Sequence, residues 1–165
     1  MTYFCTAGIV GDDPRIAAYR FLSTWLLEAP RERVWDTIYD AERWPAWWRG
    51  VERCEVIDDR LWRSAWRSVL PYTLEFEFEI LLVDRPNVLE GRAGGELSGT
   101  GSWRVYESPL GTASTWEWNV STTKRWMNVF GPATRATFAW NHHRIMRWGA
   151  EGVARELGCR LIAAA

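Results

Sequence analysis

Lysine and histidine are both scarce in this 165-residue chain. Lys124 is the only lysine, so nearly all of the 20 cationic side chains are arginine, and 21 acidic side chains bring the net charge to −1. This balance lacks the basic excess of a nucleic-acid surface, so we expect no nucleic-acid partner. His142 and His143 are the only histidines. Because strand glutamates such as Glu77 are predicted to point away from them, we expect no metal and no other cofactor.

Paired cysteines and long apolar runs are missing as well. Cys5, Cys54 and Cys159 are an odd number at wide spacing, without a CxxC motif. This pattern argues against a disulfide framework or a zinc site and favours reduced thiols. No apolar run approaches the roughly 20 residues of a membrane span, and the N-terminus lacks a signal pattern. We therefore expect a cytoplasmic protein without integral membrane association, and the sequence leaves its oligomeric state open.

Tryptophan, in contrast, is abundant: the chain has 13, many at every second position of strand-like runs. Trp62 and Trp66 share one parity, as do Trp116 and Trp118, and most residues between them are Arg, Glu, Ser or Thr. Because a strand alternates its side chains between two faces, this pattern predicts a sheet with one aromatic and one hydrated face. A concave aromatic face needs a cover, and any volume left beneath the cover is a pocket.

The length predicts a single domain, which we place at residues 19–165 after an N-terminal extension of residues 1–18. The alternation over Tyr19–Glu28 predicts an opening strand. Residues 29–38 are typical of a short helix with Pro30 near its start, and residues 44–48 of a second short helix or tight turn.

Six further strands are expected between these short helices and the last third of the chain, and their hairpin turns define a register. The predicted opposite pairs are Val56 with Trp62, Trp66 with Phe76, Glu79 with Arg92, Gly91 with Gly99, and Trp103 with Trp118. In this register every aromatic parity lies on one face and Arg–Glu pairs lie on the other. A slip of one residue would exchange the faces, so the agreement supports the assignment of faces.

A long helix is predicted from Pro132 to Gly158, where the hydrophobic period changes from two to about 3.6 residues. Its apolar stripe comprises Ala139, His142, Met146, Ala150, Val153 and Leu157. Gly158 is suited to the position just after the last turn. We expect this helix to cover the aromatic face of the sheet.

This order of elements, together with several local strings, resembles the START-like helix-grip superfamily, of the polyketide cyclase/dehydrase and lipid-transport type. The strings are Phe21–Glu28 continuing into Ala29-Pro30 and Val34-Trp35, Trp44–Trp48, Gly99–Trp103, Thr122–Met127, Trp140–His143 and Met146–Gly149. Thr122–Met127, and Trp140–His143 with Met146–Gly149, are similar to an uncharacterised bacterial subgroup of the superfamily. Over residues 19–158 the resemblance implies an α+β helix-grip fold, in which a curved seven-stranded antiparallel sheet wraps around the C-terminal helix and an apolar cavity. It implies no reaction, because one fold serves many functions.

The candidate ligand-binding residues follow from the inner parity of the strands and the apolar stripe of the helix. They are Trp62, Ser64, Trp66, Phe76, Phe78, Gly91, Gly99, Gly101, Trp103, Trp116, Trp118, His142 and Met146. The glycines are expected to leave space or to let the sheet bend. Such a pocket favours a planar or polycyclic ligand, or a lipid. The alternative is that the rings interlock with the helix and fill the volume.

His142 is the best polar candidate, because it lies on the apolar stripe of the helix. Its imidazole is expected either to orient a ligand hydroxyl or carbonyl and titrate near neutral pH, or to be buried and paired with a backbone carbonyl. His143 points about 100° further round the helix. Ser64 and Cys54 lie on the inner parity, but no general base can be assigned to either, so no catalytic residue is predicted.

Three functions therefore remain open. The first is binding of a hydrophobic small molecule or lipid, for transport or sequestration. The second is a cyclase or dehydratase reaction on an aromatic or polyketide substrate, for which the inner face offers no carboxylate except Glu52. The third is a partner-binding module with a filled core, whose exposed patch would comprise Trp47, Trp48 and Trp126.

Overall fold

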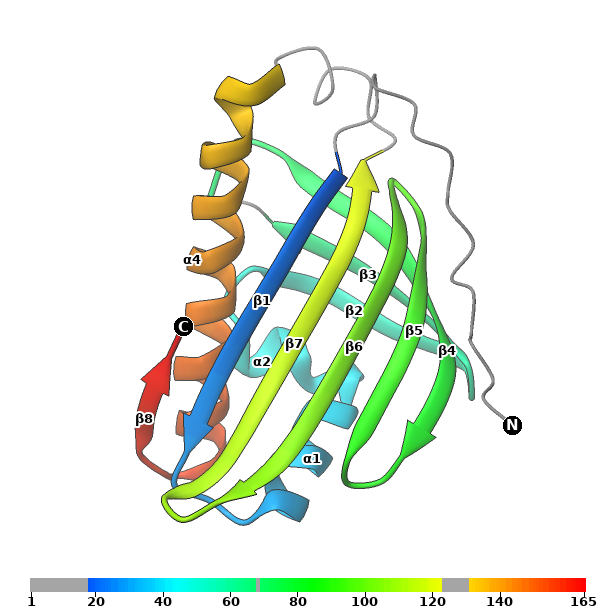
Figure 1. Cartoon of the computed structure of the whole chain (residues 1–165). Coiled ribbons are helices and arrows are strands. Elements are labelled where there is room, and N and C mark those ends of the chain that lie inside the picture. Colours follow the sequence, from blue (N-terminus) through cyan, green and yellow to red (C-terminus); the bar gives the residue numbers. More distant parts are fainter. Residues whose placement is uncertain (1–17, 68, 123–130) are drawn as a thin grey trace, which may run out of the picture.

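The computed structural model describes residues 18–67, 69–122 and 131–165. They form an eight-stranded antiparallel sheet with the order β2-β3-β4-β5-β6-β7-β1-β8 and several helices (Figure 1). In chain order the elements are β1 (Ala18–Leu27), α1 (Arg31–Tyr39), the 3-10 helix η1 (Ala41–Arg43), α2 (Trp44–Trp47), β2 (Val51–Asp58), β3 (Leu61–Arg67), β4 (Thr73–Asp84), β5 (Val88–Gly95), β6 (Leu97–Ser108), β7 (Gly111–Thr122), α4 (Gly131–Leu157) and β8 (Leu161–Ala164). The predicted α+β helix-grip architecture is confirmed.

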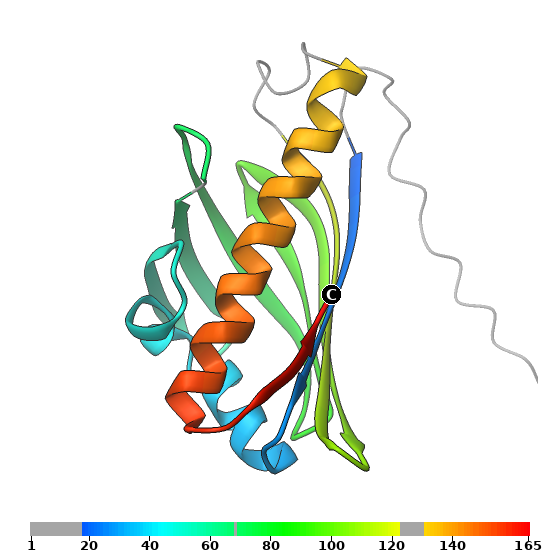
Figure 2. The ribbon, with the colours of Figure 1, turned by 90° about the vertical axis from the view of Figure 1, so that its left-hand side faces the viewer.

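The sheet is strongly curved, and α4 lies across its open side (Figure 2). The short helices α1 and α2 pack against α4 near the end of the sheet where β1 finishes (Figure 1). Three sides of the interior are thus formed by the inner face of the sheet, α4 and this pair of helices. The predicted extension, residues 1–18, lies outside the described residues apart from Ala18, which begins β1.

The short helix α1 forms where an apolar spacing follows a proline. Val34, Trp35 and Ile38 are all buried, as the helical spacing of these residues predicts. Pro30 directly precedes the first helical residue instead of occupying it, and Glu32 places an acid in the first turn, where a helix favours negative charge.

The long helix α4 presents small residues to the core where it passes α2. At Gly149 an added Cβ would lie 2.4 Å from Cε2 of the Trp48 ring, and at Gly152 it would lie 2.0 Å from the Trp47 carbonyl oxygen. Neither position tolerates a side chain unless the backbones separate. The helix ends at Gly158, whose φ of +62° is the left-handed conformation expected at this position.

The hairpin registers are predicted correctly in part. The pairs Val56–Trp62 and Glu79–Arg92 are confirmed. The other three hairpins are shifted by two residues, so that the observed pairs are Ser64 with Phe76, Gly91 with Gly101, and Trp103 with Trp116. Each turn is centred one residue away from the predicted centre. A shift of two residues keeps every side chain on its predicted face, so the faces are correct although the partners are not.

The outer face carries the expected Arg–Glu pairs with some exchanged partners. The predicted register of Trp66 with Phe76 would set Arg63 opposite Glu79, but Arg63 pairs with Glu77 at 2.8 Å, and Glu79 lies 3.8 Å from Arg92. Because these groups are exposed, the pairs keep the outer face hydrated and contribute little to stability.

An eighth strand, β8, extends the sheet beyond the seven strands that were predicted. It pairs antiparallel with β1, and the backbone N–H groups of Thr24 and Ala165 each donate to the carbonyl of the other residue, at 2.7 and 2.9 Å. The prediction ended at Gly158 because a segment of four apolar residues carries no clear period. The chain reverses at this glycine, so the segment that follows returns to the free edge of β1.

A cavity between the sheet and the C-terminal helix

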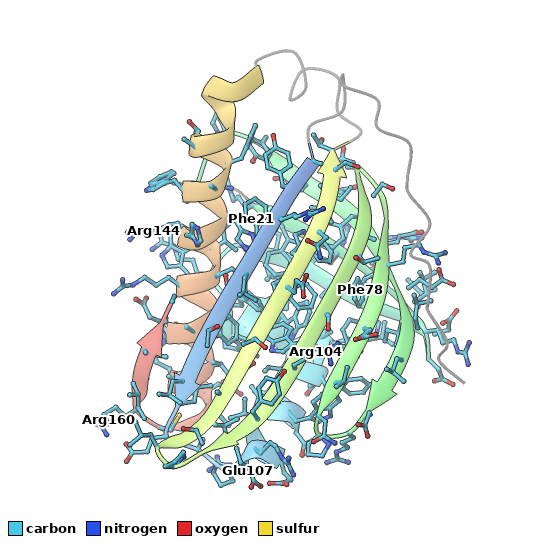
Figure 3. All side chains as sticks on the ribbon, viewed as in Figure 1. Phe21, Phe78, Arg104, Glu107, Arg144 and Arg160 are labelled. Atoms are coloured by element: carbon cyan, nitrogen blue, oxygen red, sulfur yellow. The ribbon has the colours of Figure 1, made fainter. Side chains whose placement is uncertain are left out.

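An apolar cavity of about 140 Å³ lies between the inner face of the sheet and α4. It is lined by Tyr19, Phe21, Trp44, Trp48, Cys54, Trp62, Ser64, Trp66, Tyr72, Leu74, Phe76, Phe78, Leu89, Leu97, Trp103, Trp116, Trp118, Val120, Thr122, Phe138, Asn141, His142, Ile145 and Met146. Phe21 and Phe78 enter this interior from β1 and β4, on opposite parts of the sheet (Figure 3).

Ten of the thirteen candidate residues line the cavity: Trp62, Ser64, Trp66, Phe76, Phe78, Trp103, Trp116, Trp118, His142 and Met146. The alternation of side chains along each strand therefore predicts which of them point inward. This prediction depends only on the two faces of the sheet, so register shifts of two residues do not change it.

The three candidate glycines, in contrast, do not line the cavity: Gly91 and Gly101 lie beneath aromatic rings, and Gly99 lies against the neighbouring backbone. An added Cβ at Gly91 would lie 2.4 Å from the Phe78 ring, and one at Gly101 would lie 2.5 Å from the Trp118 ring. At Gly99, with φ of +153°, an added Cβ would lie 2.0 Å from a backbone carbonyl oxygen. These glycines let rings and neighbouring backbone approach the sheet closely, and they supply no space for a ligand.

Several lining residues are absent from the prediction. Tyr19 and Phe21 have the inward parity of β1, so the alternation could have identified them. Trp44 and Trp48 could have been recognised from the Trp-Pro string. Asn141 carried no such signal, because a buried amide on a helix cannot be recognised from its sequence position. Its Oδ1 accepts a hydrogen bond of 2.9 Å from the backbone N–H of Val69, which ties α4 to the segment between β3 and β4.

The aromatic rings fill most of the interior by packing on one another. The ring centroids of Trp103 and Trp116 are 4.9 Å apart, those of Trp116 and Trp118 are 5.1 Å apart, and those of Phe76 and Trp118 are 5.6 Å apart. The remaining volume is close to that of an engineered apolar cavity of roughly 150 Å³ that stays dry and binds benzene. The cavity in this structure therefore matches one aromatic ring and not a polycyclic molecule.

His142 lies flat against Phe21, with ring centroids 4.0 Å apart and an interplanar angle of 12°. Burial, followed by the nearby His143, lowers the pKa of His142 to about 3. The imidazole is therefore neutral near pH 7, and titration in the neutral range is not expected. Its Nε2 atom is buried and has no hydrogen-bond partner among the described residues, so the expected bond to a backbone carbonyl is not formed there.

A second buried polar atom without a partner belongs to Trp66. Its Nε1–H is buried, lies in a residue that lines the cavity, and meets no acceptor within the described part of the chain. The indole can only donate, whereas a neutral imidazole nitrogen either donates or accepts. Two of the described residues that line the cavity therefore each carry a buried polar atom without a partner, although nearly all of the lining is apolar.

The other groups of the lining provide no catalytic pair. Burial, followed by Glu42 and Glu55, raises the pKa of the Cys54 thiol to about 12, so this thiol stays protonated and is a weak nucleophile. Ser64 is buried in the wall and forms no hydrogen bond with His142. The described lining holds no Asp, Glu, Lys or Arg.

Glu52 and the tryptophans Trp47 and Trp48 do not lie where the sequence hypotheses place them. Glu52 is exposed and lies 3.3 Å from Arg67, outside the cavity. Trp47 and Trp48 are only 5% and 1% exposed, so the proposed exposed patch is wrong for these two residues, and Trp126 lies outside the described residues. The buried indole of Trp48 is satisfied, since its Nε1–H donates to the Ile145 carbonyl at 2.9 Å.

Metal and membrane features are both missing from the part of the chain that the structure covers. No group of three or more His, Cys, Asp or Glu residues there is placed to hold a metal ion. None of the helices described is both long and apolar enough to cross a membrane.

Comparison with known proteins places this architecture in a family. The family model described as "Polyketide cyclase / dehydrase and lipid transport" matches residues 20–158, and the chain therefore belongs to this family. A search of the curated proteins finds no significant match.

Solved structures show the same fold at low sequence identity. The di-domain ARO/CYC BexL from the BE-7585A biosynthetic pathway superposes with a TM-score of 0.69 and 18% identity, over 90% of this chain and 52% of that protein. The Zhui aromatase/cyclase from Streptomyces sp. R1128 gives 0.64 and 14%, over 87% and 94% of the two chains. A START superfamily protein from Mycobacterium smegmatis gives 0.64 and 9%, over 87% and 97%. The chain spans about half the length of the di-domain protein, and all three comparisons establish the fold alone.

Proposed function

We propose that this protein binds a small apolar molecule of about one aromatic ring in the cavity, for transport or sequestration. The observation that carries the proposal is an apolar cavity of about 140 Å³, two of whose lining residues, Trp66 and His142, carry buried polar atoms without partners among the described residues. Transfer of apolar surface from water into this site favours binding by roughly 25 cal/mol per Å² before the costs of association. A single ring offers enough surface for binding and fits the space.

The two unpaired atoms indicate one polar group on the ligand. A buried donor without a partner costs about 1–3 kcal/mol, and an acceptor on the ligand recovers that cost. The Trp66 Nε1–H requires an acceptor, and the neutral His142 can complement either a carbonyl or a hydroxyl group. We therefore propose a ring that carries one carbonyl or hydroxyl oxygen, with His142 and Trp66 orienting it and Ser64 as a further polar neighbour in the wall.

The matched ligands acetophenone and α-methylstyrene test this proposal, because they differ only in a carbonyl oxygen that replaces a methylene group. Titration calorimetry of the intact chain should show acetophenone binding about tenfold more tightly, which corresponds to one recovered hydrogen bond. Trp66→Phe should remove most of this preference. Trp116→Phe, which trims an indole in the same cavity but retains the Trp66 N–H, should leave the preference in place.

Two negative outcomes are separable. If neither ligand binds up to its solubility limit, the cavity is not a binding site for a single ring and the proposal fails. If both ligands bind with equal affinity, the site accepts apolar rings but the orienting role of Trp66 and His142 is wrong.

A cyclase or dehydratase reaction is the second candidate, and it is favoured by the family and by the aromatase/cyclase neighbours. Such chemistry needs groups that exchange protons near neutral pH. The described lining offers a histidine whose pKa is about 3 and a thiol whose pKa is about 12. Binding therefore accounts for the described site better than catalysis does.

A further inference from the structure

A second hollow, of about 480 Å³, lies on the outer side of α4, where this helix meets the ends of α2 and β3. It is lined by Arg49, Gly50, Arg67, Val69, Trp140, Arg144 and Trp148, and we refer to it as the outer groove. Trp140, Arg144 and Trp148 recur every four residues, so they form one face of α4. Arg144 projects from α4 away from the sheet (Figure 3). The groove is thus separate from the cavity, which neighbouring helix residues such as His142 line.

Positive charge in the outer groove is not neutralised by the described residues. The guanidinium carbons of Arg49 and Arg144 lie 4.3 and 5.8 Å from the centroid of the Trp148 ring, and neither side chain forms an ion pair there. Arg67 is the exception, because it lies 3.3 Å from Glu52. None of the described residues that line the groove is acidic. Two guanidinium groups held over one indole repel each other, so an anion between them would be stabilised.

This arrangement differs from that of most arginines on the outer face of the sheet. Arg92 and Arg104, for example, pair with Glu79 and Glu90 on neighbouring strands. The charge of the chain is almost balanced overall, yet two cations remain together in this hollow. Charge complementarity therefore points to a ligand of about two negative charges.

The groove also presents an aromatic surface and a fixed wall. The side chain of Trp140 is 52% exposed, which is unusual for a ring of this size and leaves a flat face available for stacking. Two hydrogen bonds from backbone N–H groups hold the wall. The Arg67 N–H donates to the Gly50 carbonyl at 2.6 Å, and the Val69 N–H donates to Oδ1 of Asn141 at 2.9 Å. The arginines and the indole are therefore supported by elements that are already connected.

We propose that the outer groove binds a phosphate monoester carried on a planar ring. The phosphate dianion lies between the guanidinium groups of Arg49 and Arg144, and the ring stacks on Trp140. Guanidinium groups suit a phosphate because their N–H donors pair with its oxygens in a fixed geometry. The proposal does not depend on the function of the cavity.

Phenyl phosphate is the probe for this site, with benzoate, inorganic phosphate and benzyl alcohol as comparisons. Indole N–H signals in ¹H–¹⁵N spectra, assigned with Trp140→Phe and Trp148→Phe, report on the groove residue by residue. Phenyl phosphate should shift the signals of Trp140 and Trp148 with a dissociation constant of about 1 mM or tighter. Benzoate should bind more weakly because it carries only one negative charge, and inorganic phosphate because it has no ring. Benzyl alcohol carries no charge and should leave both signals unchanged.

The variant R49Q/R144Q should weaken phenyl phosphate binding at least about tenfold. The matched control R92Q/R104Q removes the same charge from the outer face of the sheet and should leave binding unchanged. Raising the ionic strength to about 1 M, where the screening length is roughly 3 Å, should weaken binding to the wild-type protein, and this measurement needs no variant.

The proposal is overturned if phenyl phosphate causes no saturable shift in Trp140 or Trp148, or if both double variants lose affinity equally. It is also overturned if the shifts occur at Trp66 and Trp116, since the probe would then occupy the cavity. Binding that is tightest for benzoate would assign the groove to carboxylates and contradict the match to a dianion.

Discussion

The two ends of the interior differ although the same elements build both of them. At the start of β1, Tyr19 and Phe21 line the cavity, whereas four to six residues later Trp25 and Leu27 are 1% and 0% exposed and do not line it. The end beside α1 is therefore filled, and we call it the filled end, whereas Trp44 of α2 borders the cavity. The other end retains the cavity and the unpaired atom of His142.

The helix α4 repeats this contrast along its length. Its His142 and Met146 line the cavity, whereas Ala150 and Val153 are fully buried against the filled end. Gly149 lets the Trp48 ring, which borders the cavity, approach the helix closely. The filled end is thus close-packed, whereas the cavity end leaves space, and described residues there carry unsatisfied polar groups.

Truncating a ring at the filled end should produce the largest loss of stability. Trp25→Ala removes an indole that contacts the rings of Trp48 and Trp103, at centroid distances of 5.3 and 5.2 Å. We expect the free energy of unfolding to fall by about 3–5 kcal/mol, because the surrounding rings cannot close the hole. Urea unfolding, followed by far-UV circular dichroism, measures this loss.

The same truncation at the cavity end should cost less and should change binding. Trp116 is only half-buried and borders space that already exists, so Trp116→Ala should lower the free energy of unfolding by about 1–3 kcal/mol. The enlarged cavity should also accept naphthalene, which is too large for the wild-type protein. Equal losses for Trp25→Ala and Trp116→Ala would remove the distinction between the two ends.

The pH dependence of stability should show a smaller effect that belongs to the cavity end. The pKa of His142 is about 3 in the folded protein and near 6.5 when the chain is unfolded, so only the unfolded state takes up a proton between these values. The contribution of His142 is therefore complete above pH 6.5 and is lost as the pH falls towards 3. Relative to His142→Phe, the wild-type protein should lose about 1–2 kcal/mol more between pH 7.5 and pH 5, since the partly exposed ring reduces the full linkage.

Urea unfolding at the two pH values measures this difference, and His143→Phe is the matched control on the exposed side of the same helix. Parallel losses in the wild-type protein and in His142→Phe would show that the imidazole is protonated equally in both states, contrary to its buried position.

The faces of the sheet could be predicted from the sequence because they depend on a period of two. Trp103 and Trp116 point inward even though their register was misplaced by two residues. The partners of each strand depend on the centre of a turn, which a single sequence leaves uncertain by one residue. The strand β8 was missed because pairing with β1, and not a local pattern, orders its four residues.

The site was less predictable than the fold. Ring positions followed from parity, but the close approach of Phe78 to Gly91 depends on three-dimensional packing, so the glycines were misread as free space. Three-dimensional neighbours likewise determine that the polar atoms of His142 and Trp66 have no partner and that the charges of the outer groove are not neutralised among the described residues. Such properties arise from residues far apart in the chain, and local spacing does not encode them.

Diffraction from crystals held under xenon pressure tests whether one end of the interior is empty and the other is filled, because xenon occupies empty apolar cavities without needing a matched ligand. We predict a xenon atom beside Phe21, Phe76 and Trp116, and none among Trp25, Trp35 and Leu27 at the filled end. An empty density map at the first position, or xenon bound equally at both ends, would contradict the account.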